Sequence, residues 1–128
     1  NYLPKKWLSV ELYLDPRFQQ AVDLFNRRAW YEAHDAFEEI WHETAGANRR
    51  LLQGILQIAV AHVHLERGNL RGATILLGEG VGRLSSAKSG DLGLDLPPVR
   101  EQARLRLEAL QREIDPVALP VPELRDHS

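Results

Sequence analysis

Cysteine is absent from this 128-residue sequence, which excludes disulfide bonds, thiolate metal ligands and thiol nucleophiles together. The sequence also lacks an apolar run of about 18 residues and a charged-then-apolar opening segment, so we predict neither a membrane span nor a signal peptide. Methionine is absent as well, and we therefore expect that Asn1 follows processing or trimming of the N-terminus. These features favour a cytoplasmic protein.

The sequence also lacks a large excess of positive or negative charge. The 16 Lys and Arg residues nearly balance the 18 Asp and Glu residues, which gives a formal net charge of -2 without a basic block for nucleic acid. The composition, 44% hydrophobic and 27% charged, is ordinary for a soluble globular protein, and the length suits one domain with a sizeable core. We predict a single soluble domain that binds neither nucleic acid nor membrane.

Helical periodicity accounts for nearly all of the chain. Asp15-Pro16 is a typical helix start, since the carboxylate can cap the first amides and proline fits the first helical position. The segment at residues 48–67 is apolar nearly all round, which indicates a central helix. The apolar spacing predicts a four-helix core over residues 15–85, with helices at about 15–25, 30–44, 48–67 and 70–85.

The segments outside this core are shorter. We expect an N-terminal extension at residues 1–14, a loop at 86–96, a last helix at 97–115 and a proline-rich tail at 116–128 that lies extended over the surface. A weak repeat at a shift of 40 residues pairs the core helices into two similar hairpins. The predicted fold is all-α: a single compact bundle of about five helices, built from two antiparallel hairpins plus a C-terminal helix.

Ionisable residues in core-facing helical segments are the strongest functional signal. His34 and Glu38 lie one helical turn apart, on the same side of the helix as the aromatic rings of Trp30 and Trp41. Burying such groups without partners costs several kcal/mol. The pair therefore indicates a functional site or a satisfied polar network.

The predicted helix at residues 48–67 contains a second candidate histidine, His64. Gln57 and His64 lie about 20° apart around that helix and roughly 10 Å apart along it, so they can line one groove without sharing an ion. Gly54 and Ala61 would let another helix approach closely. We predict that His34, Glu38 and His64 meet in space, with Trp41, Gln57 and Asn69 in support.

Other residues of these helices have structural interpretations. Asn69 is expected to cap the fourth helix. His62 lies on a different face from His64 and is interpreted as a packing or surface residue, although the sequence leaves open whether His62 or His42 joins the cluster. We interpret the three glycines of the fourth helix as close-packing or kinking positions: Gly78, Gly80 and Gly82.

The motif residues resemble a known family. The string from Trp30 to His34 is followed by Glu38 and Trp41, and then by Gly54, Gln57, His64, Gly68-Asn69 and Gly72-Ala73. This order of residues resembles the domain-of-unknown-function family 309 over about residues 18–84. The resemblance implies a small all-helical fold and no particular reaction. It maps the family's motif positions onto His34, Glu38, Trp41, Gln57, His64 and Asn69.

Two classes of function remain open. In the first, which the sequence favours slightly, the protein is a structural or interaction module, and a buried His34/Glu38/His64 cluster fixes the register of its helices. In the alternative, it is a small metal-dependent or acid/base hydrolase-like enzyme. Two imidazoles and one carboxylate can bind a divalent metal such as Zn or Fe, or act as general acid and base without a metal.

The end of the chain gives a prediction about assembly. The last predicted helix has a leucine-rich face, and with the proline-rich tail it offers more apolar surface than a small bundle needs. We predict a weak homodimer on this basis. The apolar residues concerned are Leu105, Leu107, Leu110 and Ile114.

Overall fold

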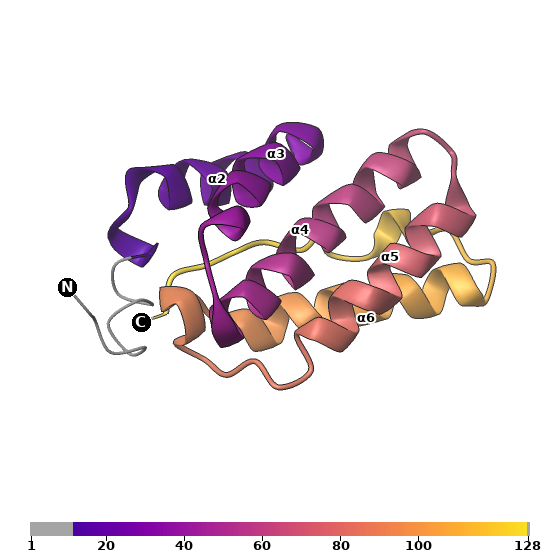
Figure 1. Cartoon of the computed structure of the whole chain (residues 1–128). Helices are drawn as coiled ribbons and strands as arrows, with labels where there is room; N and C mark the ends of the chain where they lie inside the picture. Colours follow the sequence, from indigo (N-terminus) through magenta and orange to yellow (C-terminus); the bar gives the residue numbers. More distant parts are fainter. Residues whose placement is uncertain (1–11, 128) are drawn as a thin grey trace.

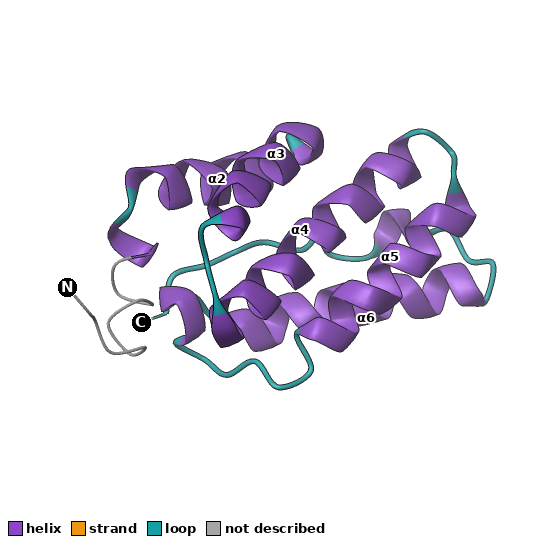
Figure 2. Cartoon of the chain, in the orientation of Figure 1, coloured by secondary structure: helices purple, strands orange, loops and turns teal. Residues whose placement is uncertain are grey.

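The computed structural model describes residues 12–127 and consists of helices joined by turns and one longer loop (Figures 1 and 2). The all-α fold class is thereby confirmed for the described residues, which contain two isolated β-bridges and no strand. Most of the predicted N-terminal extension, residues 1–11, lies outside the described residues. The helices are α2 (Pro16–Asn26), α3 (Trp30–His42), α4 (Gly46–Glu66), α5 (Leu70–Arg83) and α6 (Leu96–Gln111), with short 3₁₀ helices η1 (Asp91–Gly93) and η2 (Pro116–Ala118).

The first hairpin, α2 and α3, is fixed by its cap and its aromatic core. The Asp15 side chain accepts a hydrogen bond from the Arg17 amide, so the predicted helix start is confirmed. Phe25 packs edge-to-face against Trp30 across the turn, with ring centroids 5.0 Å apart. This contact holds the start of α3 against the end of α2.

Helix α4 is the centre of the bundle, as its apolar sequence predicts. It packs against α3 on one side and α5 on the other, and α6 packs against α5 in turn. In Figure 1, α4, α5 and α6 lie side by side, and the α2–α3 hairpin lies against α4. The fold is therefore two helical hairpins followed by one helix.

Glycine makes the α4–α5 contact close. A Cβ atom at Gly80 would lie 2.8 Å from Ile58 Cγ1 and 3.0 Å from the carbonyl oxygen of Gly54. The close-packing interpretation therefore holds at Gly80. It does not hold at Gly78, where the nearest atom would lie 4.0 Å away, or at Gly82, where nothing lies within 4 Å.

The C-terminal tail departs from its predicted place. Helix α6 ends at Gln111 rather than near residue 115, because Glu113 adopts a left-handed backbone (φ 58°). The tail that follows makes the single turn of η2 and then runs extended back along the bundle (Figure 1). The sequence predicts a tail that lies over the surface. This prediction is wrong at Leu124, which is only 2% exposed and belongs to the core.

The tail is also held by specific hydrogen bonds. The Asn26 amide group donates to the Leu124 carbonyl at 2.8 Å and accepts from the Leu124 amide at 2.7 Å. Within the part of the chain that is described, no helix is long and apolar enough to cross a membrane.

Candidate ligand-binding cavity

Two of the predicted site residues do pair on α3. His34 Nε2 lies 3.1 Å from Glu38 Oε2, and His34 Nδ1 lies 3.2 Å from Asp35 Oδ1. The prediction that this pair is buried is wrong, since the side chains of His34 and Glu38 are 23% and 46% exposed. Helix α3 turns a different face to the core, formed by Trp30, Ala33, Phe37 and Ile40.

The third predicted residue, His64, lies at the turn between α4 and α5. The Asn69 amide donates to His64 Nδ1 at 3.0 Å, and Asn69 Oδ1 accepts from the Gly72 amide at 3.0 Å. The predicted capping role of Asn69 is therefore confirmed. A side chain at position 72 would collide with this arrangement, since a Cβ there would lie 2.7 Å from the Asn69 amide nitrogen.

The register of α3 against α4 explains why His64 does not join the other two. The helices run antiparallel, and the Trp30 ring at the start of α3 stacks on the His62 ring near the end of α4, with centroids 4.2 Å apart. His34 lies about one turn from Trp30 toward the α3–α4 loop, whereas His64 lies beyond His62 in the opposite direction. Among residues 12–127, no group of three or more His, Asp or Glu side chains could hold a metal ion.

The supporting residues also have other partners. The buried Gln57 side chain donates to Glu79 on α5 at 2.9 Å. The Trp41 ring is covered by the Arg49 guanidinium, whose carbon lies 3.7 Å from the ring centroid. Neither residue adds to the His34–Glu38 pair.

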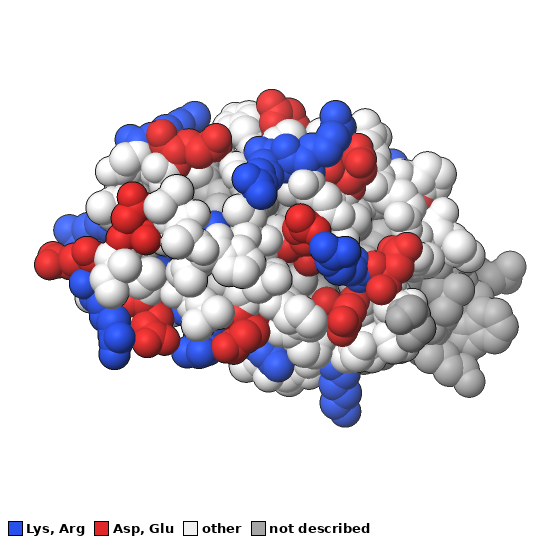
Figure 3. Space-filling model, turned by 180° about the vertical axis from the view of Figure 1, so that it is seen from behind, with Lys and Arg blue, Asp and Glu red and all other residues white. Residues whose placement is uncertain are grey.

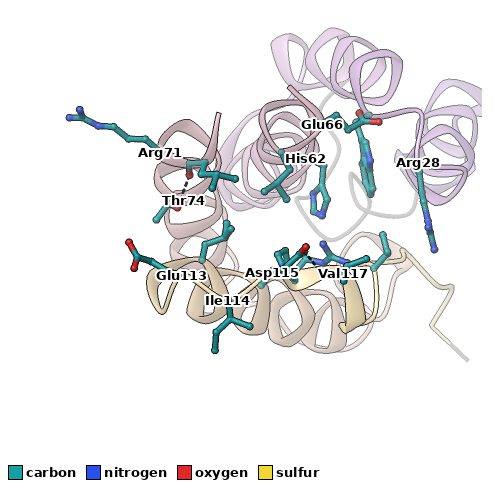
Figure 4. Close-up of a pocket in the computed structure, with 16 residues that line it drawn as sticks. Arg28, His62, Glu66, Arg71, Thr74, Glu113, Ile114, Asp115 and Val117 are labelled. Atoms are coloured by element: carbon teal, nitrogen blue, oxygen red, sulfur yellow. Dashed lines mark hydrogen bonds between the residues drawn. The ribbon is translucent and has the colours of Figure 1, made fainter. Parts of the chain in front are cut away.

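A cavity of about 820 Å³ lies at the C-terminal end of α4 (Figure 4). Its walls come from the ends of helices: the start of α3, the end of α4, the start of α5, the end of α6, and η2 with the tail. The apolar part of the lining includes Leu65, Leu110, Val117 and Val121. We call this space the His62 cavity.

His62 is the buried polar group of this cavity. It is 4% exposed, and its Nδ1–H donates to the Ile58 carbonyl at 2.8 Å. The other ring nitrogen, Nε2, is buried without a hydrogen-bond partner among the described residues. Figure 4 shows the ring extending from α4 toward the side where Asp115 and Val117 lie.

Burial keeps the His62 imidazole neutral. Desolvation, reinforced by the positive charges of Arg106 and Arg28, lowers the pKa of His62 to about 4, although the hydrogen bond to Ile58 acts in the opposite direction. At neutral pH the proton therefore stays on Nδ1, where it is bonded to Ile58. Nε2 then presents a free lone pair, which makes it a hydrogen-bond acceptor.

Two arginines, the buried Arg106 and the exposed Arg28, contribute positive charge near His62. Arg106 is 6% exposed, and its guanidinium donates to the carbonyls of Leu119 and Pro120 at 3.1 and 3.3 Å. Burial and the charge of Arg28 lower the pKa of Arg106. No carboxylate among the described residues forms an ion pair with either arginine.

The acidic residues that line the cavity do not form ion pairs with Arg28 or Arg106. Asp115 caps η2 by accepting from the Val117 amide at 2.9 Å. Glu66 and Glu113 are exposed, and Figure 4 shows Glu113 and Arg71 directed away from the centre of the cavity. On the face seen in Figure 3, acidic and basic side chains are interspersed with uncharged surface.

The sequence indicated a packed or exposed His62, but it did not indicate that Nε2 lacks a partner. The packing interpretation is confirmed by the stack on Trp30, and burial of the residue follows from the apolar segment around it. A short turn between antiparallel helices indicates that the start of α3 faces the end of α4. The cavity itself depends on Arg106 and the tail, for which the sequence offered no local signal.

Comparison with known proteins supports the predicted resemblance. The family model described as "Domain of unknown function (DUF309)" matches residues 18–76. The uncharacterized protein YpuF of Bacillus subtilis (strain 168) is 35% identical over 77 residues, which cover 58% of this chain and 44% of that protein. The chain thus spans less than half the length of this relative. The matched residues 18–76 include Arg28, Trp30 and His62 but not Arg106.

Proposed function

We propose that this chain, whose residues 18–76 belong to the DUF309 family, is a ligand-binding module that holds an organic anion with an apolar body in the His62 cavity. Like the structural or interaction module that the sequence favoured, the proposed module is not an enzyme. It moves the site from the predicted His34, Glu38 and His64 to the cavity that His62 lines.

The buried Arg106 carries this proposal. A guanidinium removed from water costs free energy unless an anion or several hydrogen bonds compensate. Arg106 is buried with two carbonyl partners and no ion pair among the described residues, and Arg28 is close enough to lower its pKa. A carboxylate or phosphate between the two arginines would form charge-assisted hydrogen bonds and remove their repulsion.

The shape and lining of the cavity support an apolar body on that anion. Small-molecule sites are typically concave spaces of about 300–1,000 Å³, lined mainly by apolar side chains with a few placed polar groups. The His62 cavity has such a volume, and Leu65, Leu110 and Val121 line it together with the Trp30 ring. An alkyl or aryl group would be held there by burial of apolar surface.

A pair of probes of equal length tests the sign of the charge. We expect decanoate to bind saturably and to shift the Trp30 indole and His62 resonances in NMR spectra, whereas decylammonium should not. Equal binding of both probes, or binding that leaves these resonances unchanged, would contradict the proposal.

A matched pair of arginine variants tests the site. Arg28→Gly should weaken decanoate binding about tenfold, which corresponds to the loss of one hydrogen bond to a charged group. Arg71→Ala is the control, because Arg71 lines the same cavity but is directed outward in Figure 4. If both variants bind decanoate like the wild type, the arginines do not form the anion site.

A second candidate keeps the enzymatic alternative on α3. The observation in its favour is the His34–Glu38 contact of 3.1 Å, an imidazole–carboxylate pair able to exchange a proton or to supply two ligands to Zn²⁺. Calorimetric titration with zinc chloride tests the metal-dependent form. Binding that His34→Gln abolishes would support it, and binding unaffected by that change would count against it.

A further inference from the structure

We infer that the anion bound in the His62 cavity carries a hydrogen-bond donor, either a hydroxyl or an amide N–H, close to its charged group, and that His62 Nε2 accepts this hydrogen bond. The inference rests on the proposed function, since it names the class of anion. It concerns hydroxy acids and N-acylated amino acids as opposed to plain carboxylic acids.

The hydrogen bond to Ile58 determines which His62 nitrogen carries the proton. The Ile58 carbonyl can only accept, so the 2.8 Å contact with His62 Nδ1 requires the proton on that nitrogen. The neutral ring then has its lone pair on Nε2. A ligand group that satisfies Nε2 must donate.

No described group of the protein donates a hydrogen bond to Nε2. Nε2 is buried and has no hydrogen-bond partner among the described residues, and His62 is one of the residues that line the cavity. Arg106 lies nearby but directs its Nε and one terminal nitrogen to the carbonyls of Pro120 and Leu119. The acceptor therefore remains for a ligand group that enters beside the His62 ring.

An unpaired acceptor at Nε2 would discriminate between classes of anion. A plain carboxylate offers only acceptors, so it can pair with the arginines while Nε2 remains unsatisfied. An anion with a neighbouring hydroxyl or amide N–H satisfies both. A site built to accept from such a donor discriminates against the analogue that lacks it, because the buried acceptor is then unpaired.

Two matched pairs of probes test this inference on the full chain. In each pair, a methyl group replaces the donated hydrogen: 3-hydroxydecanoate against 3-methoxydecanoate, and N-decanoylglycine against N-decanoylsarcosine. We expect the donor-bearing probe to bind about tenfold or more tightly in at least one pair. The pair that discriminates identifies the donor as hydroxyl or amide.

The His62→Phe variant provides the internal control. Phenylalanine keeps a ring against Trp30 but has no acceptor, so the preference should disappear while decanoate still binds. A preference that persists in this variant would overturn the assignment to His62. Should the variant not fold, the ¹⁵N shift of His62 Nε2 in the wild type must respond to 3-hydroxydecanoate and not to its methyl ether.

The outcomes separate this inference from the proposed function. Equal affinities within both pairs, with decanoate still binding, would overturn the inference and leave the anion site intact. Failure of all five acids to bind would overturn both.

Discussion

His62 combines a structural and a functional property in one side chain. Its ring fills the space between Trp30 and the cavity, and one nitrogen is bonded within α4. Both features hold the ring in one orientation, so the second nitrogen is presented at a fixed place. The sequence indicated a packed histidine, but which nitrogen lacks a partner follows only from the positions of residues distant along the chain.

The depressed pKa of His62 predicts an acid-sensitive fold. Because the pKa is about 4 in the folded protein and about 6.5 in the unfolded chain, the unfolded chain binds the proton first as the pH falls. The neutral His62 therefore contributes about 3 kcal/mol to the free energy of unfolding above pH ~6.5, and this contribution is lost between pH ~6.5 and 4. Urea unfolding at pH 7 and pH 4.5 should show this loss in the wild type and a smaller loss in His62→Phe. Equal losses would contradict the assignment.

Arg28 predicts opposite effects on stability and binding. It holds a left-handed backbone (φ 63°) that costs a non-glycine residue about 1–2 kcal/mol. Arg28→Gly should therefore raise the free energy of unfolding by up to about 1 kcal/mol, after the greater entropy of the unfolded glycine chain is subtracted. Binding of decanoate should weaken in the same variant. A variant that is less stable than the wild type would show that the arginine side chain stabilises the turn.

At the scale of elements, the residues that carry the family resemblance divide between two places. His34 and Glu38 pair on the half-exposed side of α3, whereas His64 and Asn69 belong to the α4–α5 turn together with Gly72. The sequence could predict each helix, and it could predict the cap at Asn69, because these depend on residues a few positions apart. It could not predict that His34 and His64 stay separate, because their distance depends on the register set by Trp30 against His62.

The approach of α4 and α5 predicts opposite outcomes for two glycines of one helix. Gly80→Ala should destabilise the protein by about 1–3 kcal/mol, since the new Cβ would meet Ile58 at 2.8 Å and the Gly54 backbone at 3.0 Å. Gly82→Ala should stabilise it by up to about 1 kcal/mol, because the site is open and alanine favours helix. Thermal unfolding of both variants tests the contrast. Similar shifts would mean that the helices move apart at little cost.

At the scale of the whole molecule, the cavity is assembled from both ends of the chain. Arg28 and Trp30 come from the first hairpin, whereas Arg106 and Val121 come from α6 and the tail. The sequence predicted an extended tail, but its burial depends on the Asn26–Leu124 contact across 98 positions. Local periodicity carries no signal for a contact at that separation.

The predicted homodimer stays a prediction, and the structure indicates which residues to change. Of the four apolar residues named for it, Ile114 is 55% exposed, and the neighbouring Val117 is 80% exposed. Sedimentation equilibrium should show a weak dimer that Ile114→Glu together with Val117→Glu abolishes. A monomer at high protein concentration would contradict the prediction. Ile75→Glu is the control, since Ile75 is exposed on α5 but does not line the His62 cavity.

The tail predicts a coupling between stability and binding. Asn26→Ala removes both hydrogen bonds to Leu124 and leaves the buried peptide group of that residue unpaired, which should cost about 2–4 kcal/mol. Because Val117 and Val121 form one wall of the cavity, a loosened tail should also weaken decanoate binding, although Asn26 does not line the cavity. Denaturant unfolding and calorimetry on one preparation measure both effects. Asp23→Ala, an exposed change on the same helix, should alter neither; lost stability with full binding in Asn26→Ala would show that the cavity is held by α4, α5 and α6 alone.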